Sequence, residues 1–289
     1  MCQNYNAYMG SSQKDLTVVI VTFKSEKVID DCIKSIDKDL PIIVVENSNN
    51  QNFKRLLEEK FDNVKCILTN ENLGMGRGNN VGIKNTNSKY VMIINPDTIL
   101  YKNTISELIN ISNKIDFSIL SPICDDKNYP NYKGVNHEEN DLIDVNHVDG
   151  YSMLLNKSKF NNQYFDEEIF MFLENNDLCK RMKARKEKIF ISKNAKIKHY
   201  GGKSVDFKKD LEIEILRNWH WMWSKFYFKK KYNGFVYALI SSLFPLLTTS
   251  LKSIFFLIIN KKKSKIYSNR LSGLFNSILG NKSFKRPEI

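Results

Sequence analysis

The sequence predicts an α/β fold whose mainly parallel sheet is covered by helices on both faces. Strand-like apolar runs alternate with helix-like stretches through the first half of the chain. These runs are apolar throughout, as expected for strands buried on both faces in a parallel sheet. The 289 residues, 42% of them hydrophobic, suffice for one large domain and an appendage or for two modest domains.

Five apolar runs are the predicted strands of this first half: LTVVIVTF (16–23), PIIVVEN (41–47), VKCIL (64–68), YVMIIN (90–95) and FSILSPI (117–123). Helical patterns lie between them, over Val28–Ile36, over Asn52–Phe61, up to Asn85 and over Thr104–Asn113. Right-handed crossovers gather the carboxyl ends of such strands at one edge of the sheet. Ligands bind at that edge in open α/β sheets.

The second half predicts a less regular arrangement. Residues 125–146 are polar and predict an exposed loop or short hairpin, before a strand at VDGYSMLLN (148–156). ENNDLCKRMKARK (174–186) predicts a helix, KIFISKNAKIKHYGGKS (188–204) predicts two short strands and a turn, and the chain beyond 207 is predicted helical. The polar start has no secretory pattern. We therefore expect a disordered leader at 1–15, a domain at 16–206 and a helical tail at 207–289.

Polar residues follow three of the predicted strands. Thr22, Glu46 and Asp97 lie at or just after the strand ends, and Pro96 stops the strand before Asp97 because it donates no backbone hydrogen bond. They either face one cleft or are ordinary strand-ending residues. A carboxylate such as Asp97 suits Mg²⁺ or Mn²⁺. His199, at another strand end, is a candidate second ligand, although a lone histidine is also commonly structural.

The stretch NENLGMGRGNNVGIK (70–84) is rich in glycine ahead of a helix. It has neither the Walker pattern nor the dinucleotide-binding spacing. Its glycines, Gly74 among them, would let the backbone approach a phosphate or sugar, and Arg77 would add positive charge. A purely structural turn is the competing interpretation.

Two pairs of acids lie in FDEEIFMFLENNDLCKR (165–181). Glu174 and Asp177 are three residues apart, so they share a face at the start of the predicted helix. They could act as a general base and its orienting partner, or simply interact favourably with the helix N-terminus.

The cysteine count and the charge distribution indicate the redox compartment and the most basic part of the chain. The five cysteines are scattered and odd in number, which is typical of a reducing compartment and not of a disulfide frame or zinc site. Residues 1–199 hold 27 basic and 27 acidic residues, whereas residues 200–289 hold 17 and 5. The formal net charge of +12 therefore comes from the tail.

The tail combines this charge with an apolar segment. GFVYALISSLFPLLTTSL (234–251) is uncharged, is interrupted by Pro245 and lies between Lys229–Lys231 and Lys261–Lys263. Interfacial or re-entrant helices, one membrane span and a packed helix pair are the alternatives. Basic clusters at both ends favour the first, on anionic lipid, with the nearby tryptophans at the bilayer surface. The apolar run argues against a nucleic-acid partner, and a homodimer formed through the tail is compatible with the sequence.

The motifs together resemble family 2 inverting glycosyltransferases of the GT-A fold, especially their rhamnosyltransferase-like branch. The matching segments are VVIVTFKSEKVIDDCIKSI, IIVVENS, NLGMGRGNNVGI, YVMIINPDTIL, VDGYSMLLNKSKF, FDEEIFMFLENNDLCKR and HYGGKS, which follow the family order from about 16 to 204. The resemblance implies a GT-A domain with a mixed, mostly parallel sheet, followed by a helical, membrane-associating tail.

The resemblance also implies roles for individual residues. Thr22, Phe23 and Glu46 would bind the nucleoside, and Asn95-Pro96-Asp97 would be the DXD-like motif in which Asp97 holds Mg²⁺ or Mn²⁺. His199 would be a further metal ligand. The other implied donor-binding residues are Gly74, Arg77, Asn80, Asn95, Asp149 and Gly150. Of the acids, Glu174 would be the catalytic base and Asp177 the second candidate.

The implied reaction moves a sugar from a nucleotide-sugar donor, dTDP-rhamnose or a UDP-hexose, to a lipid-linked or cell-surface polysaccharide acceptor. It would occur at the cytoplasmic face of the plasma membrane, with the protein peripheral or re-entrant. The sequence departs from the family pattern at Asn95, the first position of the DXD pattern, and at Asn175, where many relatives carry the base. Because an amide takes no proton at neutral pH, the alternative is a catalytically inactive, membrane-attached partner protein.

Overall fold

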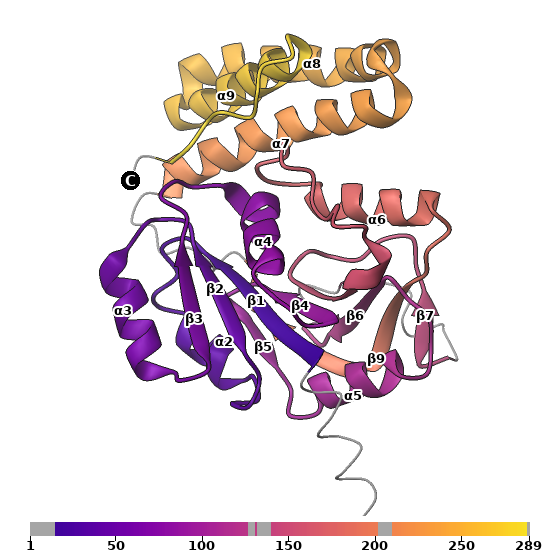
Figure 1. Cartoon of the computed structure of the whole chain (residues 1–289). Coiled ribbons are helices and arrows are strands. Elements are labelled where there is room, and N and C mark those ends of the chain that lie inside the picture. Colours follow the sequence, from indigo (N-terminus) through magenta and orange to yellow (C-terminus); the bar gives the residue numbers. More distant parts are fainter. Residues whose placement is uncertain (1–14, 127–130, 132–139, 202–209, 288–289) are drawn as a thin grey trace, which may run out of the picture. The chain divides into compact units, whose positions relative to one another are not determined.

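The computed structural model describes residues 15–126, 131, 140–201 and 210–287, which fall into two compact units (Figure 1). The first contains the sheet. The second contains the helical tail together with Gly74–Gly76 and Asp166–Asp177. These two short segments come from the part of the sequence that we assigned to the catalytic domain. The predicted leader lies almost entirely outside the described residues, as does most of the loop predicted at 125–146.

The first unit is built on a mixed sheet, nine-stranded within the described residues. In spatial order its strands are β3 (Val64–Leu68), β2 (Ile42–Glu46), β1 (Leu16–Thr22), β4 (Tyr90–Ile94), β8 (Ser152–Asn156), β6 (Ile119–Cys124), β9 (Ile189–His199) and β5 (Thr98–Leu100), with β7 (Leu142–Asp144) paired to β9. Strands β1 to β4 are parallel, and β8 runs antiparallel to both β4 and β6. The predicted α/β fold is confirmed.

The prediction of two short strands and a turn at 188–204 is wrong for the residues of β9. It is one strand of 11 residues. Its pairing with β6 shifts register, so that Pro122 lies opposite Ser192 while Ile123 lies opposite Lys196. A bulge of this kind adds residues to one strand without ending it. The strand consequently reaches His199, which lies opposite Thr98 of β5.

Helices cover both faces of the sheet. They are α2 (Ile29–Lys34), α3 (Gln51–Lys60), α4 (Gly74–Lys84), α5 (Thr104–Ser112) and α6 (Glu174–Ala184), with a 3₁₀ turn at Lys157–Lys159. Val18 and Ile20 of β1 share a core with α2, α3 and α5. Because side chains alternate along a strand, Val19 and Val21 point to the other face, where α4 packs. A Cβ on Gly82 would overlap Val19, and one on Gly78 would lie 2.9 Å from Val21 Cγ1.

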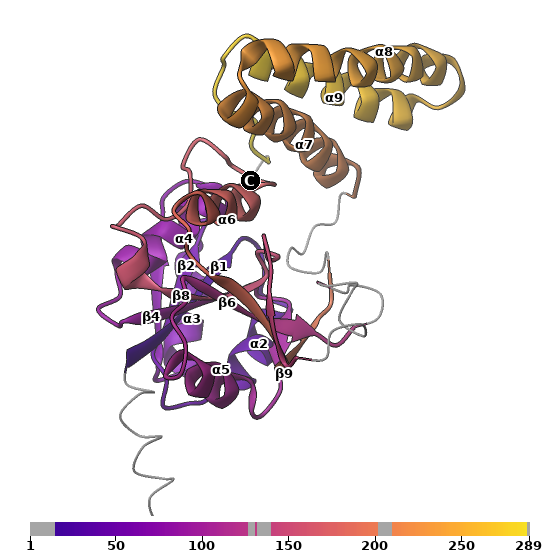
Figure 2. The same ribbon diagram turned by 90° about the vertical axis from the view of Figure 1, so that its right-hand side faces the viewer.

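The second unit consists mainly of α7 (Asp210–Asn233), α8 (Phe235–Ile259) and α9 (Lys261–Ile278), which lie side by side in Figure 2. Met222 and Phe226 of α7, Ala238 of α8 and Leu274 of α9 form its core. The Ser264 hydroxyl of α9 donates to the Ser253 carbonyl of α8 at 3.0 Å.

Helix α8 turns its small residues inward and its large apolar residues outward. Its buried residues are Ala238, Ser242 and Thr249. Eleven of its exposed residues are Val236, Ile240, Leu243, Phe244, Leu247, Leu251, Ile254, Phe255, Leu257, Ile258 and Ile259. In the described part of the chain, α8 alone is long and apolar enough to cross a membrane. Small residues at helix contacts with large apolar residues outside are typical of helices in lipid.

Two of the three tryptophans of α7 do not follow the prediction that they gather at a bilayer surface. Trp219 and Trp223 are 1% and 2% exposed, and their indole N–H groups donate to Ser272 Oγ and to the Asn281 carbonyl. Trp221 is 37% exposed. An indole buried with its N–H satisfied is a core residue, so two of the three tryptophans stabilise the helical unit.

Candidate functional site

The ends of β1 and β2 form one polar cluster of the first unit. Thr22 and Glu46 lie opposite each other in the sheet, and the Thr22 hydroxyl donates to the Glu46 carboxylate. The Ser48 backbone N–H donates to Glu46 Oε1 at 2.7 Å. Burial raises the pKa of Glu46, and the hydrogen bonds from Ser48 and Thr22 oppose that rise. The predicted neighbours Thr22 and Glu46 thus form a buried, hydrogen-bonded pair.

The second cluster lies where β4 ends and β5 and β9 pair. Asp97 is fully buried, and its Oδ1 lies 3.3 Å from His199 Nε2. The Tyr200 N–H donates to the Asp97 carbonyl at 3.1 Å, which ties the end of β9 to the turn after β4. The imidazole of His199 also stacks on the Tyr151 ring, with centroids 4.2 Å apart. The structure therefore brings together the two residues that we expected to share a cation.

Further donor-site candidates belong to the same unit. Burial raises the pKa of Asp149, against the lowering effect of His147 and His199, and it also raises the pKa of Tyr151. The Oδ1 of Asn95 is buried and, among the described residues, accepts no hydrogen bond. A buried acceptor without a partner carries a substantial desolvation cost, which a bound ligand or cation would relieve. Gly150, between Asp149 and Tyr151, is half-buried.

The chemistry of Asp97 and His199, 3.3 Å apart, fits a divalent cation. Within the described ranges no three His, Cys, Asp or Glu side chains gather as a metal site. Mg²⁺ in phosphate-transferring sites usually takes one or two carboxylates from the protein and its other ligands from phosphates and water. A carboxylate, an imidazole and a buried amide oxygen are ligand types that such a cation accepts.

The glycine-rich stretch has clear structural roles. Gly74 has φ +78°, and a Cβ there would overlap the Phe170 carbonyl, which accepts from the Met75 N–H at 3.1 Å. Arg77 lies on the surface, 3.7 Å from Glu71. The side-chain amide of Asn80 is buried and exchanges two 2.9 Å hydrogen bonds with the backbone of Phe165. Contact of Gly74, Arg77 and Asn80 with a donor stays a prediction.

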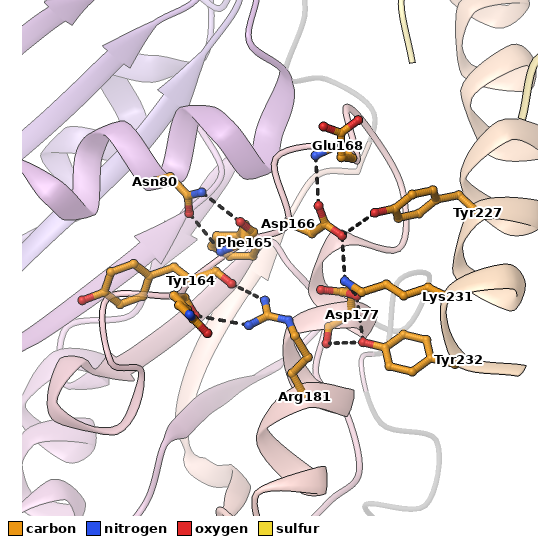
Figure 3. Close-up of polar contacts among 11 residues, drawn as sticks. Asn80, Tyr164, Phe165, Asp166, Glu168, Asp177, Arg181, Tyr227, Lys231 and Tyr232 are labelled. Atoms are coloured by element: carbon orange, nitrogen blue, oxygen red, sulfur yellow. Dashed lines mark hydrogen bonds and ion pairs between the residues drawn. The ribbon is translucent and has the colours of Figure 1, made fainter. Parts of the chain in front are cut away.

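Asp177 lies in an ion-paired cluster of the second unit (Figure 3). Its carboxylate is fully buried; Oδ1 lies 2.5 Å from Lys231 Nζ and accepts from the Tyr232 hydroxyl at 2.7 Å. Lys231 also lies 2.7 Å from Asp166 Oδ2, which accepts from the Tyr227 hydroxyl at 2.9 Å. We therefore assign Asp177 a structural role, which leaves Glu174 as the candidate base.

Glu174 begins α6 directly after two residues with unusual backbone angles. Phe172 and Leu173 have φ of +69° and +68°, which costs roughly 1–3 kcal/mol each for residues other than glycine. Burial raises the pKa of Glu174 to about 7, and its Oε2 accepts no hydrogen bond from the residues that the structure describes. A pKa near 7 is the range in which a general base works well at neutral pH.

The residues that sequence analysis missed are the partners of these acids. We assigned Lys229–Lys231 to a membrane surface, yet Lys231 pairs with two buried carboxylates and Lys229 donates to Ser241 Oγ at 2.9 Å. A lysine run looks the same in sequence whether it faces solvent or an ion pair. Tyr151 was an available signal, because it directly follows Asp149 and Gly150 in a segment that we had singled out.

Comparison with known proteins agrees with this geometry. Residues 17–190 match the family model described as "Glycosyl transferase family 2". The low-salt glycan biosynthesis hexosyltransferase Agl10 of Haloferax volcanii is 30% identical over 199 residues, which is 61% of this chain and 64% of that protein. An uncharacterized glycosyltransferase of Rickettsia prowazekii, RP339, is 34% identical over 90 residues, 31% of this chain and 28% of the relative. The chain thus matches less than two thirds of either relative.

Solved structures share the fold. S. aureus TarS 1–349 in complex with UDP-GlcNAc is 16% identical, with a TM-score of 0.55 and coverage of 92% of both chains. GalNAc-T7 with UDP, GalNAc and Mn²⁺ is 12% identical, with a TM-score of 0.53 over 64% of this chain and 42% of that one. These similarities confirm the predicted GT-A fold. The chain belongs to glycosyl transferase family 2.

Proposed function

We propose that the protein moves a sugar from a nucleotide-sugar donor to a lipid-linked or cell-surface glycan, with inversion at the anomeric carbon. The juxtaposition of Asp97 and His199 at 3.3 Å carries the proposal. It lies at the sheet edge where the predicted nucleoside residues Thr22 and Glu46 also end their strands. Complexes of structural neighbours with UDP-GlcNAc or UDP support a nucleotide-sugar donor. The branch resemblance favours dTDP-rhamnose, with a UDP-hexose as the alternative.

Asp97, His199 and Asn95 would hold Mg²⁺ or Mn²⁺ against the donor diphosphate. When bound, the cation supplies positive charge that stabilises the departing nucleoside diphosphate. Thr22, Phe23 and Glu46 would orient the nucleoside. Asp149 and Gly150 would position the sugar. Holding the donor in one orientation raises the rate of transfer, because the anomeric carbon is then already aligned with the attacking hydroxyl.

Glu174 would take the proton from the acceptor hydroxyl. The oxygen of that hydroxyl attacks the anomeric carbon from the face opposite the leaving group; the new glycosidic bond forms as the bond to the nucleoside diphosphate breaks, which inverts the configuration. A carboxyl with a pKa of about 7 is substantially ionised at neutral pH yet basic enough to accept the proton. Asn175 need not act as a base in this scheme.

We also propose that the second unit binds the cytoplasmic, anionic face of the plasma membrane through α8. The outward face of α8 is apolar, and residues 215–287 hold 14 basic residues and no acidic one. Each lysine near anionic lipid contributes on the order of 1 kcal/mol. The same charge disfavours a second copy of this surface as the partner. Sedimentation with phosphatidylserine vesicles should exceed that with phosphatidylcholine vesicles; equal binding to both would contradict the electrostatic part.

Donor binding is the direct test of the transfer. Thermal stability of the full chain is measured against UDP-glucose, UDP-galactose, UDP-GlcNAc and dTDP-rhamnose, each with and without Mn²⁺. We expect at least one nucleotide sugar to stabilise the protein, and more strongly with Mn²⁺, because a ligand that binds the folded state raises its stability. No stabilisation by any donor would overturn the proposed function.

The asparagine at 175 favours a second candidate, a catalytically inactive membrane-attached partner protein. The two candidates differ in donor hydrolysis, in which water replaces the acceptor. If the wild-type protein releases nucleoside diphosphate from the donor and Glu174 is the base, the Glu174→Gln variant does not release it. A wild-type protein that binds a donor but neither transfers nor hydrolyses it would favour the inactive partner.

A further inference from the structure

The segment that carries Glu174 is held by α7 of the same unit. Lys231 and Tyr232 contact Asp177, while Lys231 and Tyr227 contact Asp166. These two acids lie on either side of Glu174 in the sequence, at the two ends of Asp166–Asp177. We call this segment the acidic loop.

Contacts along the middle of the acidic loop add to this hold. The Ser224 hydroxyl donates to the Met171 carbonyl at 2.8 Å. The Phe170 ring stacks on His220, with centroids 4.5 Å apart, and the Arg286 guanidinium lies 3.8 Å from the Phe170 centroid. Phe172 meets Trp221 edge to face at 5.7 Å.

The backbone conformation of the acidic loop depends on these contacts with the rest of the helical unit. Phe172 and Leu173 both have positive φ, immediately before Glu174. Residues other than glycine keep this backbone conformation only where surrounding contacts enforce it. The Asp177 N–H donates to the Leu173 carbonyl at 2.8 Å, so the first turn of α6 starts from the strained pair. The direction in which Glu174 leaves the backbone is therefore set by the residues that anchor both ends.

Lys231 differs from the neighbouring lysines because its single ammonium forms ion pairs with two carboxylates. Asp177 is fully buried and the side chain of Asp166 is 14% exposed, so both depend on a nearby positive charge. Loss of Lys231 would remove the ammonium that lies within 2.7 Å of both buried carboxylates. The ends of the acidic loop would then separate from α7, and the strained pair between them could relax.

We propose that Lys231 is a positioning residue that fixes the acidic loop and so sets the orientation of Glu174, an inference that rests on the proposed function of Glu174 as base. The helical unit thus contributes to catalysis, in addition to any binding of lipid. Lys231 itself touches no reacting atom in this scheme. Its effect is on the turnover step and not on donor binding, because the predicted donor-binding residues other than Gly74 belong to the first unit.

The rate test compares Lys231→Met with Lys230→Met in the full chain. Lys230 carries the same charge in the same lysine run, and its ammonium lies over the Phe235 ring. With the donor that binds in the panel, we expect Lys231→Met to lower kcat for nucleoside diphosphate release about 100-fold, the lower range of a general base's contribution. KM for the donor should stay within about twofold. In this assay, which contains no lipid, Lys230→Met should match the wild type. Lys231→Arg should recover most of kcat, because a guanidinium can also bridge two carboxylates.

Hydrogen exchange tests the loop without any activity. Peptides from 166–177 should exchange faster in Lys231→Met than in Lys230→Met, while β1 peptides stay unchanged. If Lys231→Met does not fold, Asp177→Asn/Lys231→Met also removes one of the two carboxylates that lost the ammonium. Its loop should still exchange faster and its kcat should stay low.

The outcomes separate the two proposals. Unchanged loop exchange, an unchanged kcat, or an equal loss in Lys230→Met would overturn the role of Lys231. Absence of donor binding and turnover in the wild type would instead overturn the proposed function. In that case faster exchange in Lys231→Met would show a hold on the loop that serves structure alone, and the positioning role would be rejected with the function.

Discussion

Glu174 offers a prediction whose magnitude follows from its surroundings. Its pKa rises from an ordinary value of 4.5 to about 7 because the carboxyl is buried. Between these two pH values the folded protein binds more protons than the unfolded chain, so stability falls as pH rises. The contribution is fully present below pH 4.5 and is lost as pH passes through about 7. A difference of about 2.5 in pKa, at about 1.36 kcal/mol for each, gives about 3 kcal/mol.

Glu174→Gln removes this dependence, because glutamine does not ionise in this range. We expect the free energy of unfolding of Glu174→Gln to rise, relative to the wild type, by about 3 kcal/mol between pH 4 and pH 8. Urea unfolding of both proteins at several pH values measures the difference. Glu71→Gln removes a carboxylate whose side chain is 68% exposed and serves as the matched control. Parallel stability curves for wild type and Glu174→Gln would refute the burial argument.

The same carboxyl can be observed directly and through the rate. In protein labelled with ¹³C-glutamate, the carboxyl resonance that disappears in Glu174→Gln should titrate with a midpoint near pH 7. The rate of nucleoside diphosphate release should fall below that pH as the base becomes protonated. A midpoint near 4.5, or a rate that is flat from pH 5 to 8, would show that Glu174 is not the buried base described above.

Three further perturbations address other parts of the molecule. His199→Ala should abolish the additional stabilisation that Mn²⁺ gives to the donor complex, measured by thermal shift, and an unchanged Mn²⁺ effect would count against His199 as a ligand. Gly82→Ala should lower the free energy of unfolding by about 1–3 kcal/mol because the new Cβ overlaps Val19, and the double variant with Val19→Ala should recover part of that loss if the overlap is the cause. Leu247→Asn/Ile258→Asn, at side chains 59% and 87% exposed, should weaken vesicle binding at least about tenfold, since each apolar side chain in lipid contributes roughly 1.5–3 kcal/mol; undiminished sedimentation would place the lipid contact elsewhere.

The first half of the fold was predictable because its strands are long, apolar and separated by helices. The runs at 16–23, 41–47, 64–68 and 90–95 each contain an observed parallel strand. By contrast, β5 has three residues and exists through its pairing with β9, almost 100 residues later. No local pattern signals such a pairing. The register shift that lets β9 continue through 193–195 likewise depends on β6 and not on its own sequence.

The site was predictable to the extent that it follows from strand ends. Thr22 and Glu46 meet because parallel strands end together, and Asp97 meets His199 at the paired ends of β5 and β9. The ion pair between Asp177 and Lys231 spans 54 residues and joins two segments that looked independent. Three consecutive lysines are equivalent in sequence, so only the packing of α7 selects Lys231.

The asparagine at 175 does not by itself indicate a protein without catalysis. Buried ion pairs such as those of Asp166 and Asp177 with Lys231 add little net stability compared with apolar residues of similar size. Positive φ at Phe172 and Leu173 lowers stability further. A segment whose only task was to hold the fold together would gain nothing from this combination. Strain that surrounding contacts must maintain is, however, characteristic of catalytic loops, and here it leads directly into Glu174, a carboxyl that burial has brought to a pKa of about 7. The stability that these residues forgo is therefore better explained by a base at Glu174, one residue before the position at which many relatives carry it, than by the loss of the base.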